Sequence, residues 1–330
     1  MSKKSLPTKR AVTPYPLHQC ALYKVGSKSR LAKILCVDVS DIQRLAQDVG
    51  NFKVFELPEE TCEFTGKVKK ARWVQDPVPE LKAVHRRIQI LLSRVVVPPY
   101  CHGGTKGKSY RSNAAAHVGA PAIATFDLKS FFPSTTAKQV FGFFHNDLCC
   151  APDVAGLLTD LCTYQRVLPT GSPVSPILAF WANQKLFSTL DKRSAEQDLQ
   201  VSIYVDDVTI SGNTLPRSLI EQVDGIVRKH GHKLSQGKTK CFGPGAAKHV
   251  TGVVIHRGAL KVPYSRFKKA RAISQAIKNA SDDGEKEKLT AQLSGLLGEA
   301  ACIDKSYRRW ATNSYVSLAK IRARRAAAAL

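Results

Sequence analysis

The sequence predicts an α+β fold, in which a central antiparallel sheet precedes a helical C-terminal region. Apolar residues alternate on both sides of Asp206 and Asp207, which predicts two strands joined at this acidic pair. The small apolar run 122–126 predicts a third, buried strand. Three amphipathic segments follow residue 261, and their spacing is typical of packed helices. With 330 residues and 43% apolar content, the chain can bury a substantial core.

The remaining elements follow from apolar spacing and from the positions of glycine and proline. The basic stretch 1–15 predicts a loose arm, and the glycine-rich segment 103–108 predicts a loop. The other segments predict, in chain order, two short helices within 16–48, a strand pair at 52–57 and 69–74, helices at 80–97 and 113–117, a helix at 137–161 broken near Pro152, a helix beginning at Gly171-Ser172-Pro173 and running to Leu186, a helix at 219–227, and C-terminal helices around 267–277, 289–297 and 307–321.

Three aspartates form the first candidate site. Asp127 stands at the end of the strand 122–126, so pairing of that strand with the hairpin would bring it to Asp206 and Asp207. Adjacent carboxylates repel, and hard oxygen ligands of this kind suit Mg²⁺. Two such ions roughly 4 Å apart stabilise the attacking and leaving oxygens of a phosphoryl displacement, which indicates nucleotidyl transfer. The alternatives are a polar turn at the acidic pair and a helix N-cap role for Asp127.

Positive charge is concentrated at the two ends of the chain. The formal net charge is +24. Residues 1–125 carry 21 basic and 9 acidic side chains (+12), residues 126–260 carry 14 and 11 (+3), and residues 261–330 carry 15 and 6 (+9). This distribution favours a polyanion, such as a nucleic acid, held by both flanks and processed at the centre. The alternative is charge that serves solubility, which usually mixes the two signs more evenly.

Cysteine usage and hydropathy predict a cytoplasmic protein without a membrane segment. The nine cysteines include no Cys-x-x-Cys pair, and the neighbouring Cys149 and Cys150 do not suit ordinary disulfide geometry. Met1-Ser2-Lys3-Lys4 leads into no apolar stretch typical of a secretory signal. Apolar runs such as 90–92 are soon interrupted by polar residues, so no membrane span is predicted.

Five short motifs resemble those of one polymerase family. The segments 126–132 (Phe-Asp-Leu-Lys-Ser-Phe-Phe), 168–176 (Leu-Pro-Thr-Gly-Ser-Pro-Val-Ser-Pro) and 204–207 (Tyr-Val-Asp-Asp) resemble the palm motifs of reverse transcriptases. The segments 113–117 (Asn-Ala-Ala-Ala-His) and 250–252 (Val-Thr-Gly) are similar to elements of the retron type of these enzymes. The motifs follow the order of the family, and the resemblance extends from about Lys67 to about Gly258.

The resemblance implies a right-hand polymerase architecture. This architecture has fingers, an RRM-like antiparallel palm sheet backed by helices, and an α-helical thumb. The expected boundaries are 1–15 for the basic N-terminal arm, 16–121 with part of 137–170 for the fingers, 122–260 for the palm and 261–330 for the thumb.

The resemblance also assigns the catalytic site. It implies that Asp127 and Asp206 bind two Mg²⁺ ions, for which Mn²⁺ can substitute, and that the Leu128 carbonyl completes one metal site. Asp207 is expected as a further acid of the metal site that tunes the other two. Catalysis would then consist mostly of positioning and charge neutralisation.

Five residues are expected to contact the incoming dNTP. Lys70 and Arg72 are predicted to clamp its phosphates, and the ring of Phe132 is expected to exclude a ribose 2′-OH. The segment at Gly171 is expected to open a helix whose backbone N–H groups favour an anion, with a routine turn as the alternative. Lys238 is expected to contact the triphosphate or to protonate the departing pyrophosphate, with a bystander role as the alternative.

Two groups of residues are expected to bind nucleic acid. The first belongs to the two retron-type elements and comprises Asn113, His117, Val250, Thr251 and Gly252. The second is a set of basic side chains on the C-terminal helices, namely Arg308, Arg309, Arg322, Arg324 and Arg325. A hydrogen bond within the protein is the alternative for His117.

The implied function is that of a retron-type RNA-directed DNA polymerase. Such an enzyme copies a structured non-coding RNA into single-stranded DNA, primes from an internal 2′-OH and leaves a branched RNA–DNA hybrid. The implied setting is antiphage defence together with an effector protein. The alternatives are an intron maturase or abortive-infection polymerase, an RNA-binding antitoxin or scaffold with vestigial polymerase activity, and a two-metal nuclease. Thr170, where Gln is common, and the residues Ile203-Tyr204-Val205 depart from the family pattern.

Overall fold

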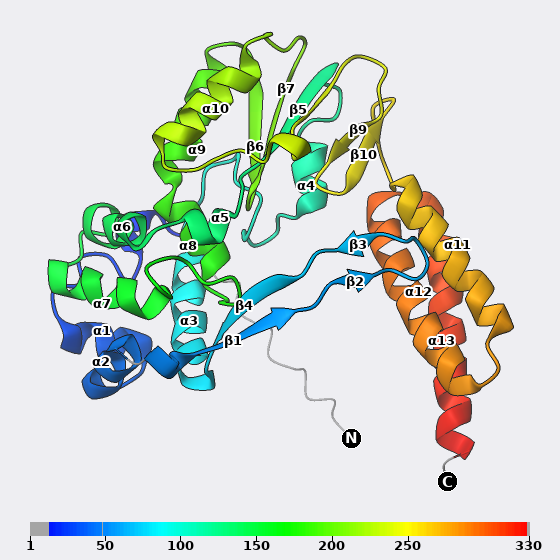
Figure 1. Cartoon of the computed structure of the whole chain (residues 1–330), viewed down its shortest axis with the longest axis horizontal. Helices are drawn as coiled ribbons and strands as arrows, with labels where there is room; N and C mark the ends of the chain where they lie inside the picture. Colours follow the sequence, from blue (N-terminus) through cyan, green and yellow to red (C-terminus); the bar gives the residue numbers. More distant parts are fainter. Residues whose placement is uncertain (1–12, 48, 329–330) are drawn as a thin grey trace, which may run out of the picture.

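The computed structural model describes residues 13–47 and 49–328. Figure 1 shows a sheet with its covering helices, a helical lobe that contains the N-terminal helices, and a separate bundle of C-terminal helices. A long two-stranded ribbon extends from the helical lobe toward the bundle. The predicted basic arm, 1–15, lies outside the described residues except for 13–15.

The central sheet contains four antiparallel strands in the order β6-β7-β5-β8. They are β5 (Ala122–Asp127), β6 (Gln200–Tyr204), β7 (Asp207–Gly212) and β8 (Lys240–Phe242). Both inner strands are buried over most of their length, because other elements cover both faces of the sheet. The predicted buried strand and the predicted hairpin are therefore confirmed.

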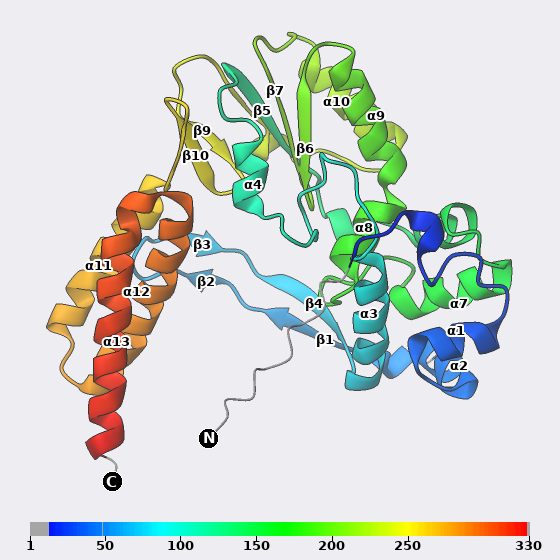
Figure 2. The ribbon, with the colours of Figure 1, turned by 180° about the vertical axis from the view of Figure 1, so that it is seen from behind.

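Two layers cover the central sheet. α9 (Gln184–Ala195) and α10 (Leu219–Lys229) lie on one face (Figures 1 and 2). On the other side lie α4 (Tyr110–Ala115) and a second sheet, formed by β9 (Lys248–Val250), β10 (Val253–His256) and β11 (Ala259–Lys261). Ala114, Ile123 and Val253 belong to one buried apolar cluster, which joins α4 and the second sheet to β5.

The helical lobe combines segments from both sides of β5 in the sequence. Pro152 begins a helix, which confirms the predicted interruption, because proline suits the first helical position. The helix predicted from 171 to 186 is wrong at both ends, since it begins at Ser175 and Asn183 separates it from α9. The helix predicted at 80–97 ends at Leu92. The elements are α1 (Lys28–Leu35), α2 (Val39–Gln47), α3 (Pro79–Leu92), α5 (Phe131–Ser134), α6 (Ala137–Gly142), a π-helical turn (Phe143–Asp147), α7 (Pro152–Cys162) and α8 (Ser175–Ala182), with 3-10 turns at Leu17–Gln19 and Val49–Asn51.

The ribbon pairs β1 (Phe52–Leu57) with β4 (Arg72–Pro77) and ends in a short hairpin. The hairpin consists of β2 (Glu60–Thr61) and β3 (Val68–Lys69). The strand predicted at 69–74 is therefore displaced, because Lys69 pairs within the hairpin and pairing with β1 starts only at Arg72.

The C-terminal bundle consists of α11 (Tyr264–Asn279), α12 (Asp283–Ile303) and α13 (Arg308–Ala328), which confirms the three predicted helices. Its own core includes Ile273, Leu293 and Leu297. Phe64, in the turn between β2 and β3, packs against this core, so the tip of the ribbon contacts the bundle (Figure 2). Within residues 13–47 and 49–328, no helix combines the length and apolar character that a membrane span requires.

Candidate active site

The central hairpin ends in a strained two-residue turn. Val205 and Asp206 form this turn, and the flanking residues Tyr204 and Asp207 pair with each other. Val205 has a φ of 60°, a left-handed conformation that is rare for a β-branched residue. A side chain at Gly103 would collide with the backbone nitrogen of Val205, so the close approach of this loop requires glycine. Local strain of this kind is typical of functional sites, and here it lies beside the acidic pair.

The three aspartates meet at one edge of the central sheet. Asp127 ends β5 and lies opposite Asp207 in the register of β5 and β7. The backbone N–H of Leu128 donates to the carbonyl of Asp206 at 2.9 Å. Burial, followed by the carboxylates of Asp206 and Asp127, raises the pKa of Asp207 to about 7. Burial and the Asp127 carboxylate also raise the pKa of Asp206. The predicted convergence of the three carboxylates is therefore present.

Both carboxylate oxygens of Asp127 have partners in the segment after α10. The hydroxyl of Ser235 donates to Oδ2 at 2.6 Å, and the ammonium of Lys238 donates to Oδ1 at 2.7 Å. The backbone N–H of Ser235 also donates to the Asp127 carbonyl at 2.8 Å. The hydrogen bond to Asp127 and the charge of that carboxylate raise the pKa of Lys238, so the ammonium stays protonated at neutral pH.

The donor set suits a divalent cation. Carboxylate oxygens are the ligands that Mg²⁺ prefers, and a bound cation relieves repulsion between neighbouring acids. In the described part of the chain, no group of three or more His, Cys, Asp or Glu side chains is arranged to enclose a metal ion. One oxygen that an ion would need, Oδ1 of Asp127, holds the ammonium of Lys238. The aspartates therefore fit a cation by the chemistry of their oxygen donors, while their arrangement here is closed by the Lys238 ammonium.

Pockets open on both sides of Asp127. One, which we call the front pocket, has a volume of about 570 Å³, and its lining includes Arg72, Trp73, Phe132, Thr170 and Asp206. The other, the rear pocket, has a volume of about 310 Å³, and its lining includes Asp207, Thr209, Lys240, His249 and Thr251. Asp127 and Lys238 line both pockets. The acidic edge therefore lies between two binding spaces.

The structure places three of the five predicted dNTP contacts in the lining of the front pocket. The front pocket is lined by Arg72, Phe132 and Lys238, whereas Lys70 is exposed on the connection before β4 and lies outside that lining. A Cβ at Gly171 would lie 2.6 Å from the carbonyl oxygen of Gln75, so glycine lets this loop reach β4. Because α8 begins at Ser175, Gly171 does not provide the predicted helix N-terminus, and its role here is close packing.

Thr170, where the family commonly has Gln, joins the same loop to β4. Its backbone N–H donates to Oε1 of Gln75 at 3.1 Å, and its hydroxyl donates to the carbonyl of Trp73 at 3.0 Å. The side chain of Gln75 therefore links β4 to this loop. Next to it, the hydroxyl of Ser172 donates to Nδ1 of His85 at 2.7 Å. Nε2 of this buried histidine lies 2.7 Å from a carbonyl oxygen of α7, which fixes the tautomer with the proton on Nε2.

The two retron-type elements pack against each other and against the sheet. The side-chain amide of Asn113 donates to Oγ1 of Thr251 at 3.4 Å, and the Thr251 hydroxyl donates to a main-chain carbonyl of α4 at 2.9 Å. The two ring nitrogens of His117 form hydrogen bonds with the hydroxyls of Ser202 and Ser211, each at 2.6 Å. These bonds join α4 to β6, β7 and the end of β9.

This packing corrects part of the nucleic-acid prediction. Asn113, His117 and Val250 are at most 1% exposed, so their side chains cannot reach a nucleic acid, and the alternative of an internal hydrogen bond holds for His117. Thr251 and Gly252 line the rear pocket, and both stay predicted nucleic-acid contacts.

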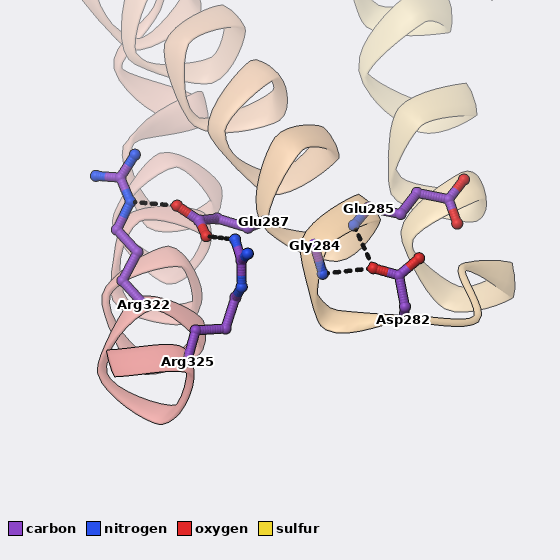
Figure 3. Close-up of polar contacts among 6 residues, drawn as sticks. All are labelled: Asp282, Gly284, Glu285, Glu287, Arg322 and Arg325. Carbon is purple, nitrogen blue, oxygen red and sulfur yellow. Dashed lines mark hydrogen bonds and ion pairs between the residues drawn. The ribbon is translucent and has the colours of Figure 1, made fainter. Parts of the chain in front are cut away.

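Two of the predicted nucleic-acid-binding arginines are engaged within the bundle. Nε of Arg322 donates to Oε1 of Glu287 at 3.0 Å, and Arg325 donates to the other oxygen of the same carboxylate (Figure 3). Asp282 caps α12 by accepting two N–H groups of its first turn, at 2.6 and 2.9 Å. These bonds fasten the end of α13 to the beginning of α12, while the side chains of Arg322 and Arg325 stay 60% and 51% exposed, so both remain predicted nucleic-acid contacts. The other members of the set are also exposed: Arg308, Arg309 and Arg324.

Three polar side chains that form internal hydrogen bonds around the site belong to no motif that the sequence shows. Ser235, His85 and His232 are each a single polar residue without the regular spacing that marks a motif. The histidines are buried and hydrogen-bonded in the structure, and Ser235 bonds Asp127. The signal at Ser235 is its place three residues before Lys238, the predicted phosphate contact.

Comparison with known protein families identifies the fold. The family model described as "Reverse transcriptase (RNA-dependent DNA polymerase)" matches residues 24–255. The chain belongs to the reverse transcriptase family. Among curated proteins, this reverse transcriptase is similar to the retron Ec86 reverse transcriptase of Escherichia coli. The two are 32% identical over 216 residues, which cover 64% of this chain and 67% of that protein.

Two further relatives also carry retron names. The retron Se72 reverse transcriptase of Salmonella heidelberg is 29% identical over 225 residues, covering 65% of this chain and 57% of that protein. The retron Mx162 reverse transcriptase of Myxococcus xanthus is 29% identical over 319 residues, covering 86% and 64%. The matches thus span 57 to 67% of the length of these relatives. Together with the family match, they support a polymerase of the retron type with an α+β fold.

Proposed function

We propose that this reverse transcriptase is an RNA-directed DNA polymerase of the retron type. One observation carries the proposal: three aspartates meet at a sheet edge between two pockets that share Asp127 and Lys238. Nucleotidyl transfer joins two substrates at one phosphorus atom. A site with two binding spaces and an acidic edge between them suits that reaction.

Asp127, Asp206 and the Leu128 carbonyl would hold two Mg²⁺ ions, with Asp207 beside them, and Mn²⁺ suits the same oxygen donors. Bound ions of this kind lower the pKa of an attacking hydroxyl and neutralise charge on a triphosphate. The contribution of the chain is to place the acids, since the strand register sets Asp127 opposite Asp207 and Ser235 orients the Asp127 carboxylate.

We assign the front pocket to the incoming dNTP. Arg72 lines this pocket, and its planar guanidinium matches the geometry of phosphate oxygens. The ring of Phe132 lines the same pocket and would exclude the 2′-OH of a ribonucleotide. Lys238, released from Asp127, is free to contact the triphosphate or to protonate the leaving pyrophosphate. Lys70, two residues before Arg72, is proposed as an outer phosphate contact.

We assign the rear pocket to the strand that supplies the attacking hydroxyl. Lys240, His249 and Thr251 line this pocket beside Asp207, and such side chains commonly contact the sugar–phosphate backbone. Gly252 lies in the same lining and leaves room for the strand. The exposed arginines of the bundle add positive charge for the RNA and its DNA product: Arg308, Arg309 and Arg324.

The proposed template is a structured non-coding RNA, and the proposed product is single-stranded DNA joined to that RNA through a 2′-OH branch. We further propose a cytoplasmic role in antiphage defence together with an effector protein. The retron names of the relatives support these proposals. The excess of basic residues at both ends of the chain, +12 and +9, also suits a polyanionic partner.

The decisive test of the site is Asp206→Asn. We expect this variant to lose Mg²⁺-dependent dNTP incorporation on an RNA template by about 10³-fold, because a neutral amide removes a metal-binding charge. RNA affinity, measured by fluorescence anisotropy, should be unchanged. The matched control is Asp198→Asn at an exposed position with φ of 54°, which asparagine adopts readily. Incorporation that survives in Asp206→Asn at the level of this control would remove the site assignment.

Sequencing of nucleic acid that co-purifies with the protein tests the retron type. A covalently branched RNA–DNA hybrid is the expected result. An RNA-binding scaffold with vestigial chemistry would instead bring down RNA alone, and Asp206→Asn would leave that RNA unchanged. Linear DNA without a branch would favour another kind of reverse transcriptase.

A further inference from the structure

A buried polar cluster, which we call the gate network, lies behind the one-turn helix α5 that carries Phe132. Its members come from α5, α6, the junction of α8 and α9, and the chain after α10. They are Ser134, Thr135, Gln139, Asn183 and His232. Thr135, Asn183 and His232 are at most 3% exposed, so their hydrogen bonds must be satisfied within the protein.

The hydrogen bonds of the gate network indicate which ring nitrogen of His232 carries the proton. The amide nitrogen of Asn183 donates to Oγ1 of Thr135 at 3.0 Å and to the Ala179 carbonyl at 2.9 Å, which leaves Oδ1 as an acceptor. Nε2 of His232 therefore donates to that oxygen at 2.7 Å, and Nδ1 accepts from the hydroxyl of Ser134 at 2.8 Å. Burial lowers the pKa of His232 to about 4, so the ring is neutral at pH 7.

The network holds the backbone and the rings of α5. The N–H of Thr135 donates to the carbonyls of Phe131 and Phe132, each at 3.0 Å, and its hydroxyl donates to the Phe131 carbonyl at 2.9 Å. The Phe131 ring packs between His232, at a centroid distance of 5.5 Å, and Phe132, at 6.0 Å. A helix of four residues is not stable by itself, and it starts from Ser130 at a φ of 50°. The position of the Phe132 ring therefore depends on its buried neighbours.

The chain that supplies His232 also reaches the acidic edge. The carbonyl of Lys233 accepts the backbone N–H of Lys129 at 2.8 Å, which ties this chain to the residues just before α5. Two residues further on, Ser235 donates to Asp127. One short segment thus contacts both the aromatic side of the front pocket and the acid at its base.

We propose that His232 and Asn183 are positioning residues that fix the Phe132 ring and thereby set the preference of the front pocket for deoxyribonucleotides. This inference rests on the proposed function, in which Phe132 faces the sugar of the incoming nucleotide. A dNTP and an rNTP differ at the sugar by one hydroxyl group. The enzyme can discriminate between them only if the Phe132 ring does not move to make room for that group. The network provides that rigidity without touching the substrate.

The test compares His232→Gln with the parent protein. A glutamine amide can keep the bond to Asn183 but loses the bond to Ser134 and the ring packing on Phe131. The readout is the ratio of kcat/KM for a dNTP to that for the matching rNTP in single-nucleotide extension on an RNA template. We expect this ratio to fall about tenfold or more, while kcat for the dNTP changes by less than about threefold. His230→Gln, two positions away, is the control and should match the parent, because the His230 ring bonds the carbonyl of Ile226 and only its backbone carbonyl, which the substitution keeps, accepts from Gln139.

Two further variants test the positioning role separately from the folding of His232→Gln. Ser134→Ala removes the Nδ1 partner and the contact of the same hydroxyl with the Phe131 carbonyl at 3.1 Å, and it should lower the same ratio by a smaller factor, even where His232→Gln fails to fold. Phe132→Ala should abolish the preference. A parental ratio in His232→Gln and Ser134→Ala, beside a relaxed ratio in Phe132→Ala, overturns the positioning role and leaves the gate intact. A parental ratio in Phe132→Ala overturns the gate, and absence of dNTP incorporation by the parent overturns the proposed function itself.

Discussion

Two lysine–aspartate ion pairs, one at the edge of the central sheet and one between the second sheet and the C-terminal bundle, differ in their surroundings. Lys238 contacts Asp127 at 2.7 Å beside two other carboxylates, and Asp127 is 9% exposed. Lys261, the last residue of β11, contacts Asp304 at 2.9 Å in the connection between α12 and α13, where that aspartate also caps a short turn. The first pair neutralises a crowded acidic edge, whereas the second fastens a helix connection. Similar ion-pair geometry therefore occurs beside the proposed catalytic acids in one region and at a helix connection in the other.

The largest expected effect comes from breaking the first pair. Lys238→Met should lower dNTP incorporation by about 10²-fold, because the ammonium that neutralises or protonates the leaving phosphate is lost. Lys261→Met is the matched control at the junction of the second sheet and the bundle, and it should leave incorporation within about twofold of the parent, because this pair contacts none of the three aspartates of the acidic edge. Primer extension at saturating template measures both. Equal losses in the two variants would show that the pairs do not differ in function.

The second comparison concerns acid sensitivity. The central part of the molecule contains buried His85 and His117, whose pKa burial lowers to about 4. An unfolded histidine has a pKa of about 6.5, so between pH 6.5 and 4 each of these histidines binds more protons in the unfolded chain than in the folded chain. Burial lowers the pKa values of His102 and His232 to about 4 in the same way, so the histidines together outweigh the opposite contribution of Asp207, whose pKa is raised. The free energy of unfolding should therefore fall as the pH falls through this window.

The bundle should respond at lower pH. Residues 261–330 contain no histidine, and hydrogen bonds lower the pKa of Asp282, Glu287 and Asp304. Such carboxylates contribute stability above their unfolded pKa values, and this contribution is lost only as the pH falls below about 4.5. Tryptophan fluorescence in acid titrations separates the regions, because Trp181 lies in the central core and Trp310 packs on the bundle core. Coincident transitions for variants that retain only one of these tryptophans would contradict the expected order.

The smallest expected effect distinguishes two neighbouring arginines of the bundle. Arg324 and Arg325 are both exposed, and Arg325 also donates to Glu287 (Figure 3). Arg324→Gln should reduce the salt slope of RNA binding by about one unit and leave the melting temperature unchanged, as loss of a phosphate contact does. Arg325→Gln should lower the melting temperature slightly and leave the slope near the parental value. The opposite pattern would place the RNA against Arg325.

Part of the fold and part of the candidate site could be predicted from the sequence. The strand β5, the hairpin and the meeting of Asp127 with the acidic pair were predictable, because apolar alternation and the position of an acid at a strand end are local features. The displacement of β4 and the late start of α8 were not predicted. Pairing within the β2–β3 hairpin sets where β4 begins, and Pro176, in the first turn of α8, marks where that helix begins. The three aspartates of the site were therefore predicted, whereas the residues that hydrogen-bond to them and around them were not.

The sequence by itself determined the order of the elements, the acidic edge, the basic flanks and the family to which the motifs belong. Only the tertiary structure decided which polar side chains are enclosed and which partners they take. Lys238 meets Asp127 across 111 positions, and Asn113 meets Thr251 across 138. Burial and hydrogen bonding between such distant residues depend on how helices and strands pack, and no local spacing in the chain encodes them.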